Sequence, residues 1–516
     1  MSISVICVPI HIITQNPLES GIDEPTAING NLMNSKTVFA IDLGAESGSV
    51  MAVHYDGQGL HLQELYRFPN VSVTVNGTLH WYFLRLWRDI QDGIDKGKAL
   101  QPASMGVDTW GVDFGLLDVQ GHLIGNPVHY RDARTTGMME ALFARVPKAQ
   151  VFEQTGIQFM PINTLYQMMS LVERQSPQLA IAETFLMAPD LLNYWLTGVK
   201  VCEFSNATTT QMFNPRTRTW ATEMLEQLGI PTHILPEIVP SGTRLGTYEG
   251  IPVIAPACHD TGSAVAGVPT QSKQYAYISS GTWSLVGVEV NQPVVNSAAL
   301  EANATNEGGV YGTYRLLKNV MGLWLVQQCR ATWQKEGETY SYGELVQMAQ
   351  AAPPLQAIIN PDEARFLAPG DHAQHVRDLC AQSGQPVPET KGAIVRGVLE
   401  SLALKYRHVL EKVLTLSGQR ADVIHIVGGG TQNELLSQMT ANATGVPVLA
   451  GPIEATVIGN ALVQLITLGE LKDIHQARQL VAQMGTLKRY EPQETAAWND
   501  AYQKFLILTG KEMERR

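Results

Sequence analysis

The sequence has few cysteines and no motif that pairs them. Its five cysteines are odd in number and scattered over 516 residues, and no two stand in a C-x-x-C arrangement. This pattern is typical of buried thiols in a reducing cytosol rather than of a disulfide framework, so we expect a cytoplasmic protein.

Positive charge and long apolar runs are also scarce. The chain carries 36 Lys and Arg against 48 Asp and Glu, a net charge of −12. This balance argues against a nucleic-acid or anionic-membrane partner. No segment approaches the roughly 20 apolar residues that a membrane span needs.

Three common catalytic motifs are missing. The chain contains no G-x-x-x-x-G-K-[ST], no G-x-G-x-x-G and no H-E-x-x-H. P-loop, Rossmann dinucleotide and zincin sites therefore lose their main support. An apolar content of 45% with 16% charged residues is that of an ordinary enzyme, and the length suits two domains.

The N-terminal segment is predicted to lie outside the fold. Ser2 to Ile13 is apolar, but it lacks the basic start and the small-residue cleavage site of a signal peptide. Gln15 to Asn34 is polar and rich in turn residues, and Met33 stands just before the first predicted strand. We expect residues 1–34 to be a disordered extension or the result of a misassigned start codon.

Residues 38–53 predict a hairpin that can hold phosphate. Two apolar strands flank a turn in which Gly44 and Gly48 let backbone N–H groups crowd an anion. Ser47 and Ser49 add hydroxyl donors. Asp42 ends the first strand beside this turn, and a carboxylate next to phosphate indicates Mg²⁺, held through water. The alternative is a plain hairpin whose aspartate caps the turn.

A second hairpin repeats this pattern of apolar strand, small-residue turn and apolar strand. Residues 276–288 read as an apolar strand, a turn of Ser, Gly and Thr, and another apolar strand. Two such hairpins far apart in one chain indicate a duplicated domain with nucleotide phosphates between the copies.

The turn that follows residues 103–109 suits a sugar. Trp110 offers an aromatic face, Gly111 a bare backbone and Asp113 a carboxylate that accepts hydrogen bonds from hydroxyls. The alternative is a hairpin turn with a packed tryptophan.

Asp260 is predicted to stand at a helix N-terminus, after the strand 251–257. It could merely cap that helix, or it could be a general base directed at an attacking hydroxyl. Thr261 follows it.

Two further stretches are predicted from local pattern. Residues 319–328 read as the start of an apolar helix. Residues 428–430 are three glycines between the strand 423–427 and the helix 434–444, where a flat base or ribose can approach the backbone.

Taken together, several of these motifs resemble the FGGY carbohydrate kinases. The stretches are 42–48, 106–113, 259–261, 279–284 and 427–433. Stretches 206–211, 305–309 and 317–324 resemble one member of that family in particular. The resemblance runs in order from about Val38 to Tyr490, which makes it far more specific than any single motif.

The resemblance implies an α/β fold of two ribonuclease-H-like, actin-like ATPase domains hinged about a cleft. We expect a sugar-binding domain over 35–268, a nucleotide-binding domain over 269–490 and a tail or helix over 491–516. The implied reaction transfers the γ-phosphoryl group of ATP to O1 of L-rhamnulose with Mg²⁺. The sequence leaves the oligomeric state open between monomer and dimer.

The resemblance also implies roles for single residues. It makes Asp260 the base, and it implies sugar contacts for Gly111, His259, Thr261 and Asn319. It implies nucleotide contacts for Ala45, Glu46, Ser47, Gly48, Ser49, Thr282, Gln327 and Gly429. The member of the family that this chain resembles in particular usually carries Arg at the position of Ser49, so this chain is expected to bind phosphate less tightly on its first hairpin.

Two alternatives stay open. Another FGGY ketose kinase, acting on xylulose or fuculose, differs in only a few pocket residues. An actin-like or chaperone-like ATPase would use the same hairpins without a small second substrate.

Overall fold

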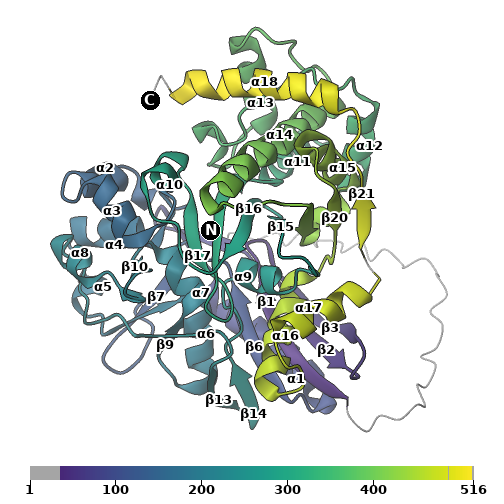
Figure 1. Ribbon diagram of the computed structural model, residues 1–516. Coiled ribbons are helices and arrows are strands. Elements are labelled where there is room, and N and C mark those ends of the chain that lie inside the picture. The colour runs from purple at the N-terminus through teal and green to yellow at the C-terminus, as the bar shows by residue number, and fades with distance from the viewer. Residues whose placement is uncertain (1–34, 486, 514–516) are drawn as a thin grey trace, which may run out of the picture.

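The structure is a computed structural model that describes residues 35–485 and 487–513 (Figure 1). The predictions for residues 1–34, with Met33 and Cys7, lie outside the described residues. The other four cysteines are buried and free. Within the described ranges, no helix is both long and apolar enough to cross a bilayer.

Two large sheets form the framework, one in the lower and one in the upper part of the view (Figure 1). The first sheet has the order β13 (Arg244–Tyr248), β14 (Ile251–Ile254), β6 (Ser104–Thr109), β1 (Lys36–Leu43), β2 (Ser47–Tyr55) and β3 (Leu60–Pro69). The second has the order β17 (Thr305–Gly308), β18 (Tyr314–Met321), β16 (Trp283–Val290), β15 (Tyr275–Ser280), β19 (Val423–Val427), β20 (Val448–Ala450) and β21 (Lys488–Tyr490).

The two sheets share one topology. In the first, β1 pairs antiparallel with β2 and parallel with β6, while β2 continues antiparallel to β3 and β6 parallel to β14. In the second, β15, β16, β18, β19 and β20 repeat the pairings of β1, β2, β3, β6 and β14 in turn. Both predicted hairpins thus occupy the same place in two copies of one unit, which confirms the predicted two-domain α/β fold.

Helices and short ribbons complete each half. The chain up to residue 268 contains α1 (Phe83–Gly97), α2 (Met138–Phe143), α3 (Lys148–Thr155), α4 (Thr164–Glu173), α5 (Pro177–Ala180), α6 (Ala188–Thr197), α7 (Phe204–Ala207), α8 (Thr222–Gln227) and α9 (Asp260–Ala266). Its short strands pair as β4 (Ser72–Val75) with β5 (Thr78–Trp81), β7 (Phe114–Leu117) with β8 (Thr184–Met187), β9 (Val201–Glu203) with β12 (Glu237–Val239), and β10 (Phe213–Asn214) with β11 (Thr219–Trp220).

The second half contributes the remaining helices. These are α10 (Ser297–Ala302), α11 (Trp324–Lys335), α12 (Tyr342–Ala351), α13 (His372–Gln382), α14 (Lys391–Ser417), α15 (Glu434–Thr444), α16 (Ala455–Leu468), α17 (Ile474–Gln483) and α18 (Thr495–Met513). Helix α14 packs against β16 and β18. It begins where Thr390 accepts a hydrogen bond from the N–H of Ala393 and ends at Gly418, whose φ of +66° suits glycine.

One predicted element differs from the structure. Residues 319–328 were expected to begin a helix, but β18 runs to Met321 and α11 starts only at Trp324. Asn319 is therefore a strand residue that pairs with Leu285 of β16. The apolar run is short, and strand and helix cannot be told apart by periodicity over so few residues.

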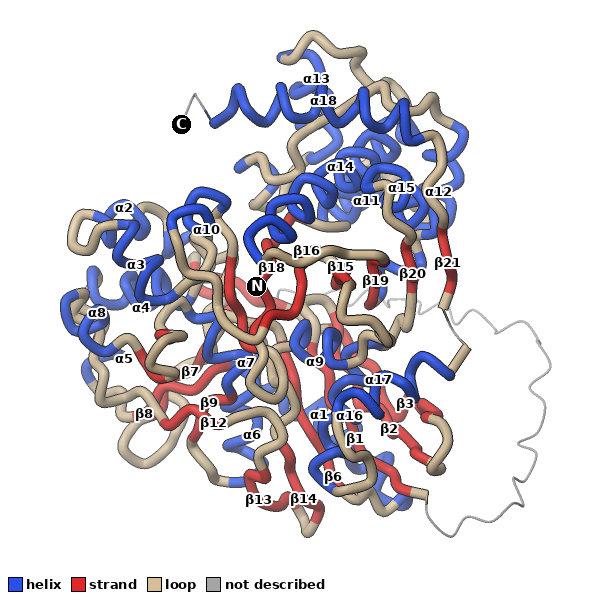
Figure 2. Tube along the Cα trace, in the orientation of Figure 1, coloured by secondary structure: helices blue, strands red, loops and turns tan. Residues whose placement is uncertain are grey.

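Two helices from late in the chain cover the first sheet. Apolar side chains of α16 and α17 pack against Val38, Ala40, Met51 and Val53, and Figure 2 shows both helices beside β1 and β2. The face of the first sheet that carries these residues is thus completed by residues beyond 450. The predicted division of the chain after residue 268 stays a prediction.

Helices α9 and α16 cross in backbone contact. A Cβ built on Gly459 of α16 would stand 1.7 Å from the carbonyl oxygen of Ser263 in α9. A Cβ on Gly267, just after α9, would stand 2.6 Å from the carbonyl oxygen of Ala455. Only glycine permits an approach this close.

We therefore expect Gly459→Ala to lower the free energy of unfolding by about 1–3 kcal/mol, because a backbone oxygen cannot rotate away from the new methyl group. The measurement is urea unfolding followed by circular dichroism. Gly510→Ala is the matched control, since a Cβ at this helical glycine of α18 meets no atom within 4 Å. Equal unfolding midpoints for both variants would contradict the close helix contact.

Candidate active site

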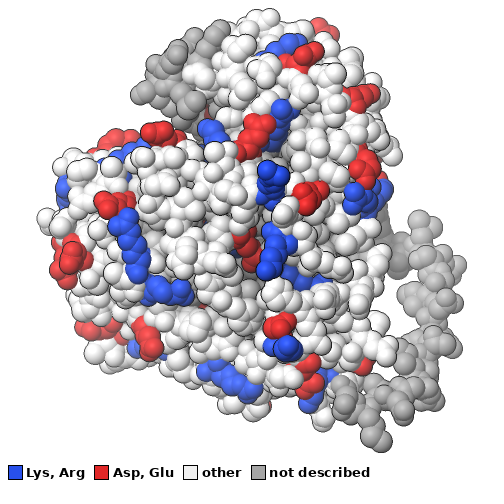
Figure 3. All heavy atoms as spheres, viewed as in Figure 1, with Lys and Arg blue, Asp and Glu red and all other residues white. Residues whose placement is uncertain are grey.

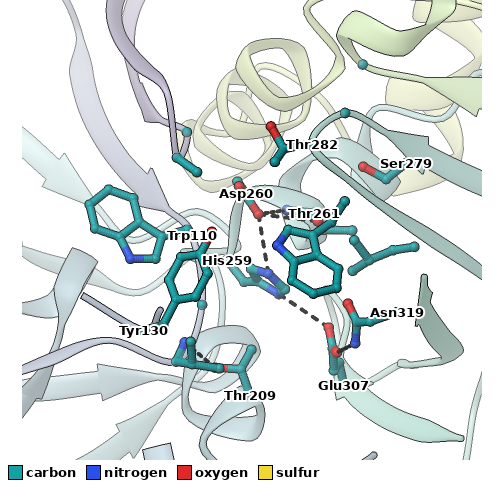
Figure 4. A pocket seen from close by; sticks show the side chains of 18 of the residues that line it. Trp110, Tyr130, Thr209, His259, Asp260, Thr261, Ser279, Thr282, Glu307 and Asn319 are labelled. Carbon is teal, nitrogen blue, oxygen red and sulfur yellow. Dashed lines mark hydrogen bonds and ion pairs between the residues drawn. The ribbon is translucent and has the colours of Figure 1, made fainter. Parts of the chain in front are cut away.

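A cavity of about 370 Å³ lies between the two sheets and is lined by residues from both halves of the chain (Figure 4). Most of the predicted site residues line it: Asp42, Ala45, Glu46, Ser47, Trp110, Gly111, His259, Asp260, Thr261, Thr282, Asn319 and Gly429. Four predicted residues do not line it: Gly48, Ser49, Asp113 and Gln327. The motifs chosen from sequence thus converge on one place.

The turn of the first hairpin forms one wall of the cavity. The N–H of Gly44 donates to the carbonyl of Ser47, and Asn70 holds the turn by donating to the carbonyls of Gly44 and Glu46. Gly48 lies behind the turn, because a Cβ there would meet the ring of Phe68 at 2.4 Å. The turn is therefore a fixed loop whose backbone faces the cavity.

Ser49 also lies behind this wall. Its side chain is 2% exposed, and it stands opposite Arg67 of β3 in the strand register. Arg67 donates to Glu454, just before α16, at 3.0 Å. A cation from the neighbouring strand thus lies close to the position that Ser49 occupies.

Carboxylates gather at the end of β1. Asp42 lines the cavity and pairs in register with Asp108 of β6, whose side chain is fully buried. Burial and the charges of Asp260 and Glu454 raise the pKa of Asp42 to about 7. Burial and Asp42 hold the pKa of Asp108 well above its usual range, although Asn460 donates to it at 2.6 Å. This is an excess of negative charge that a cation would relieve.

These residues fit a Mg²⁺ ion that keeps most of its water. Mg²⁺ is bound through one or two carboxylates together with water and substrate phosphates, and Asp42 offers such an oxygen at the cavity wall. In the described part of the chain, no three His, Cys, Asp or Glu side chains form a metal-binding group. A dedicated protein cage for a metal is therefore not what this site resembles.

The second hairpin faces the first across the cavity. Thr282 Oγ1 lies 3.5 Å from Glu46 Oε1, and Gln327 of α11 donates to Thr282 from behind at 3.3 Å. Gly428 directly follows β19 and has φ +87° and ψ −175°, a conformation that is essentially restricted to glycine. Next to it, Gly429 has open space where a side chain would be.

Asp260 is the first residue of α9, and one of its oxygens is free. The N–H of Thr261 donates to Oδ1 at 2.6 Å and its hydroxyl donates to the same atom at 3.2 Å. Among the described residues no hydrogen bond reaches Oδ2. Burial raises the pKa of Asp260 to about 6. The carboxylate is held through one oxygen and presents the other to the cavity (Figure 4).

A buried network orients His259 beside this carboxylate. Arg315 Nη2 lies 3.0 Å from His259 Nδ1, and because arginine only donates, Nδ1 accepts. The proton of the neutral ring is then on Nε2, which lies 3.3 Å from Asp260 Oδ1. Burial and Arg315 hold the pKa of His259 well below its usual value, which keeps the ring neutral. His259 is therefore positioned as a donor.

Glu307 joins this network to Asn319. Its carboxylate lies 3.3 Å from Arg315 Nη2 and accepts a hydrogen bond from Asn319 Nδ2 at 3.2 Å. Both charged side chains are buried, and as an ion pair they balance each other's charge. Figure 4 shows Glu307, Asn319 and His259 pointing toward one another on the side of the cavity opposite Trp110.

The predicted sugar contact of Asp113 is not what the structure shows. This side chain is fully buried and accepts hydrogen bonds from Trp81 Nε1, Trp110 Nε1, Gln167 Nε2 and the N–H of Tyr130. With four donors satisfied, it has no role left for a ligand. Asp113 instead fixes Trp110, whose ring lies 4.1 Å from that of Trp81.

The turn that Asp113 anchors is strained. Val112 has φ +68°, which is an outlier for a β-branched residue. The N–H of Val112 donates to the hydroxyl of Thr209. Thr164 and Gln167 donate to the carbonyl of Val112. Gly111 faces the cavity in this turn, and a Cβ there would come within 3.1 Å of Thr209. The strained turn therefore holds the backbone of Gly111, which has no side chain, in the cavity wall.

Sequence reasoning missed several residues of the site. Asp108, Arg315 and Glu307 are buried charges whose partners are distant in the chain, so local pattern gives no sign of them. Asp108 could have been found, since parallel pairing of β1 with β6 places it beside Asp42.

Comparisons with known proteins agree on one family. The model of the FGGY family of carbohydrate kinases matches with its N-terminal domain at residues 37–267 and with its C-terminal domain at residues 276–468. The chain is 45% identical over 481 residues to the rhamnulokinase of Bacteroides thetaiotaomicron, covering 90% of this chain and 98% of that protein. It is 42% identical over 490 residues to the rhamnulokinase of Pectobacterium atrosepticum, covering 93% and 98%.

Solved structures are similar in fold at lower sequence identity. A gluconate kinase from Lactobacillus acidophilus has a TM-score of 0.75 at 17% identity and covers 93% of this chain and 98% of its own. The ligand-bound xylulose kinase of the same organism has a TM-score of 0.74 at 16% identity and covers 92% and 98%.

Proposed function

The chain belongs to the FGGY family of carbohydrate kinases, and we propose that it transfers the γ-phosphoryl group of ATP to O1 of L-rhamnulose. The products are L-rhamnulose 1-phosphate and ADP, in the catabolism of L-rhamnose. The choice of sugar is supported by the two rhamnulokinases that match nearly the whole chain. The free cysteines support a reducing, cytoplasmic location.

One observation carries the chemistry: Asp260 presents an unpaired oxygen to a cavity shared by both lobes. Asp260 is the general base in this proposal, and it takes the proton from the attacking hydroxyl as the phosphoryl group arrives. His259 and Thr261 hold the other oxygen and the sugar. Gly111, Trp110 and Asn319 complete the sugar pocket.

The opposite side of the cavity receives the triphosphate. In this proposal the backbone of residues 45–47 and the hydroxyl of Thr282 surround the phosphates, while Gly429 lies against the nucleoside. Gln327 positions Thr282 rather than contacting ATP itself, and Gly48 and Ser49 shape the turn from behind. Mg²⁺, held at Asp42 through water, would neutralise charge on the β- and γ-phosphates.

Closure of the two lobes around both substrates excludes water that would otherwise accept the phosphoryl group. Glu46 and Thr282 already approach each other across the cavity. The protein therefore acts by aligning substrates and by placing charge, which is what phosphoryl transfer requires.

The sugar assignment predicts a clear preference in a panel of ketoses. With ATP and Mg²⁺, we expect L-rhamnulose to give the highest kcat/KM, above L-fuculose and D-xylulose, by coupled detection of ADP. If one of the other ketoses gave the highest kcat/KM, the enzyme would be a different ketose kinase of the same family. ATP turnover that is independent of any sugar would instead favour an actin-like or chaperone-like ATPase.

Asp260→Asn should keep sugar binding and lose about 10²- to 10⁴-fold in kcat, because the amide cannot take up the proton. Steady-state kinetics and sugar titration measure the two properties. Asp500→Asn, an exposed position on α18, is the matched control and should retain wild-type turnover. Near-normal kcat in Asp260→Asn would remove the residue from the role of base.

The pH profile should report the same carboxylate. Burial raises the pKa of Asp260 to about 6, and a base must be unprotonated to act. We therefore expect kcat/KM to be constant above about pH 7 and to fall about tenfold per unit well below pH 6. The measurement spans pH 4.5 to 8 with an assay that does not depend on coupling enzymes. A flat profile over this range would exclude a group of this pKa as the base.

A further inference from the structure

A second cavity, of about 890 Å³, lies next to the candidate active site and is lined by lysines. The two cavities share Gln158, Met160, Trp283 and Asn319 as a common wall. Of the residues that line the second cavity, the proposed reaction uses only the shared Asn319.

Four lysines from three elements line this cavity. Lys405 and Lys412 stand seven residues apart on α14, so they share one face of the helix. Lys318 comes from β18, and Lys148 begins α3 in the other half of the chain. Figure 3 shows Lys and Arg side chains interspersed with Asp and Glu on one face of the molecule.

The cations of the cavity are only partly balanced. Asp362 accepts from Lys405 at 2.8 Å, and Glu363 lies 3.7 Å from Arg365. Glu301 is then the one remaining acid of the lining, against Lys148, Lys318 and Lys412.

The contacts of Lys318 and Lys412 bear this out. Lys318 Nζ donates only to neutral groups, the carbonyls of Ala302 at 2.9 Å and Asn303 at 3.2 Å. Within the described residues, Lys412 has no hydrogen bond and no ion pair.

The pKa values of these side chains agree with an excess of positive charge in the cavity. Burial and the charge of Lys405 lower the pKa of Lys318 to about 7. Burial and the same neighbour lower the pKa of Lys412. His408, between the two lysines of α14, is neutral because burial and Lys412 lower its pKa to about 3. An anion bound among these groups would offset the repulsion that Lys405 exerts on Lys318 and Lys412.

The rest of the lining is apolar or weakly polar. Phe159, Trp283, Met321 and Leu367 provide a surface on which the C–H face of a small carbohydrate can pack. A volume of about 890 Å³ is also far larger than an inorganic anion needs.

We propose that this cavity is a binding site for a phosphorylated carbohydrate, with Lys412 and Lys318 on its phosphate and the aromatic wall against its carbon skeleton. The site is independent of the reaction proposed above. Because Asn319 follows Lys318 on β18 and is bonded to Gln158 at 2.8 Å, a ligand here contacts the wall of the neighbouring cavity.

The test is calorimetric titration of the full-length protein at pH 7 with fructose 1-phosphate, inorganic phosphate and fructose. Lys412→Met should weaken fructose 1-phosphate binding about tenfold or more, since it removes a charge-assisted contact. Lys412→Arg should bind within about twofold of the wild type. Lys472→Met, an exposed lysine outside the cavity, should leave binding unchanged. Inorganic phosphate should bind more weakly, and fructose should give the same result with every variant.

Several results would overturn the proposal. They are absence of fructose 1-phosphate binding, or equal binding by the wild type and Lys412→Met. Equal affinity for inorganic phosphate would reduce the site to a bare anion site and refute the carbohydrate part. Lys148→Met, at an exposed helix start, provides a second test should Lys412→Met lose its circular dichroism spectrum, and it should also weaken binding.

Discussion

The contact between the backbones of α9 and α16 fixes the relative positions of several residues of the site. Asp260 begins α9, and α16 places Asn460 on Asp108 and Gln464 on the backbone of β1. The positions of the proposed base and of the carboxylates at the end of β1 are therefore set by the same pair of helices. Since the helices meet through glycines at less than side-chain distance, their relative position tolerates little change.

Charge in the site is arranged by burial as much as by pairing. Asp260 raises the pKa values of Asp42 and Asp108, Asp42 also raises that of Asp108, and no arginine or lysine bonds directly to any of the three in the described residues. Arg315 is instead directed to His259 and Glu307, which keeps the imidazole neutral and its donor aimed at Asp260. In the proposed reaction, the acidic side of the cavity is thus left to a cation that arrives with the nucleotide.

Much of the fold could be predicted because its signals are local. The start and the end of helix α14 are set by a capping threonine and a terminal glycine, both next to it in the sequence. The duplicated hairpins were visible as two copies of one pattern, which the paired strand orders confirm. Asp260 stood out because a carboxylate at the start of a helix of small residues is a local feature.

The errors come from long-range partners. Asp113 was expected to bind sugar, because nothing near it in the chain reveals that Trp81 and Gln167 satisfy its oxygens. Asn319 was expected on a helix. Pairing with β16 makes it a strand residue instead, and the local sequence does not reveal that pairing. The roles of Arg315, Glu307 and the lysine cavity depend on residues brought together only by the second sheet and α14.

The packing of α16 and α17 on the first sheet has a consequence for how the protein is made. Val38, Ala40 and Val53 emerge from the ribosome some 400 residues before the helices that cover them. Until residues 455–483 are synthesised, one face of the first sheet remains exposed to water and to other nascent chains. The amino-terminal half is thus unable to finish its interior early, and synthesis of the whole chain sets the time at which it becomes a stable body.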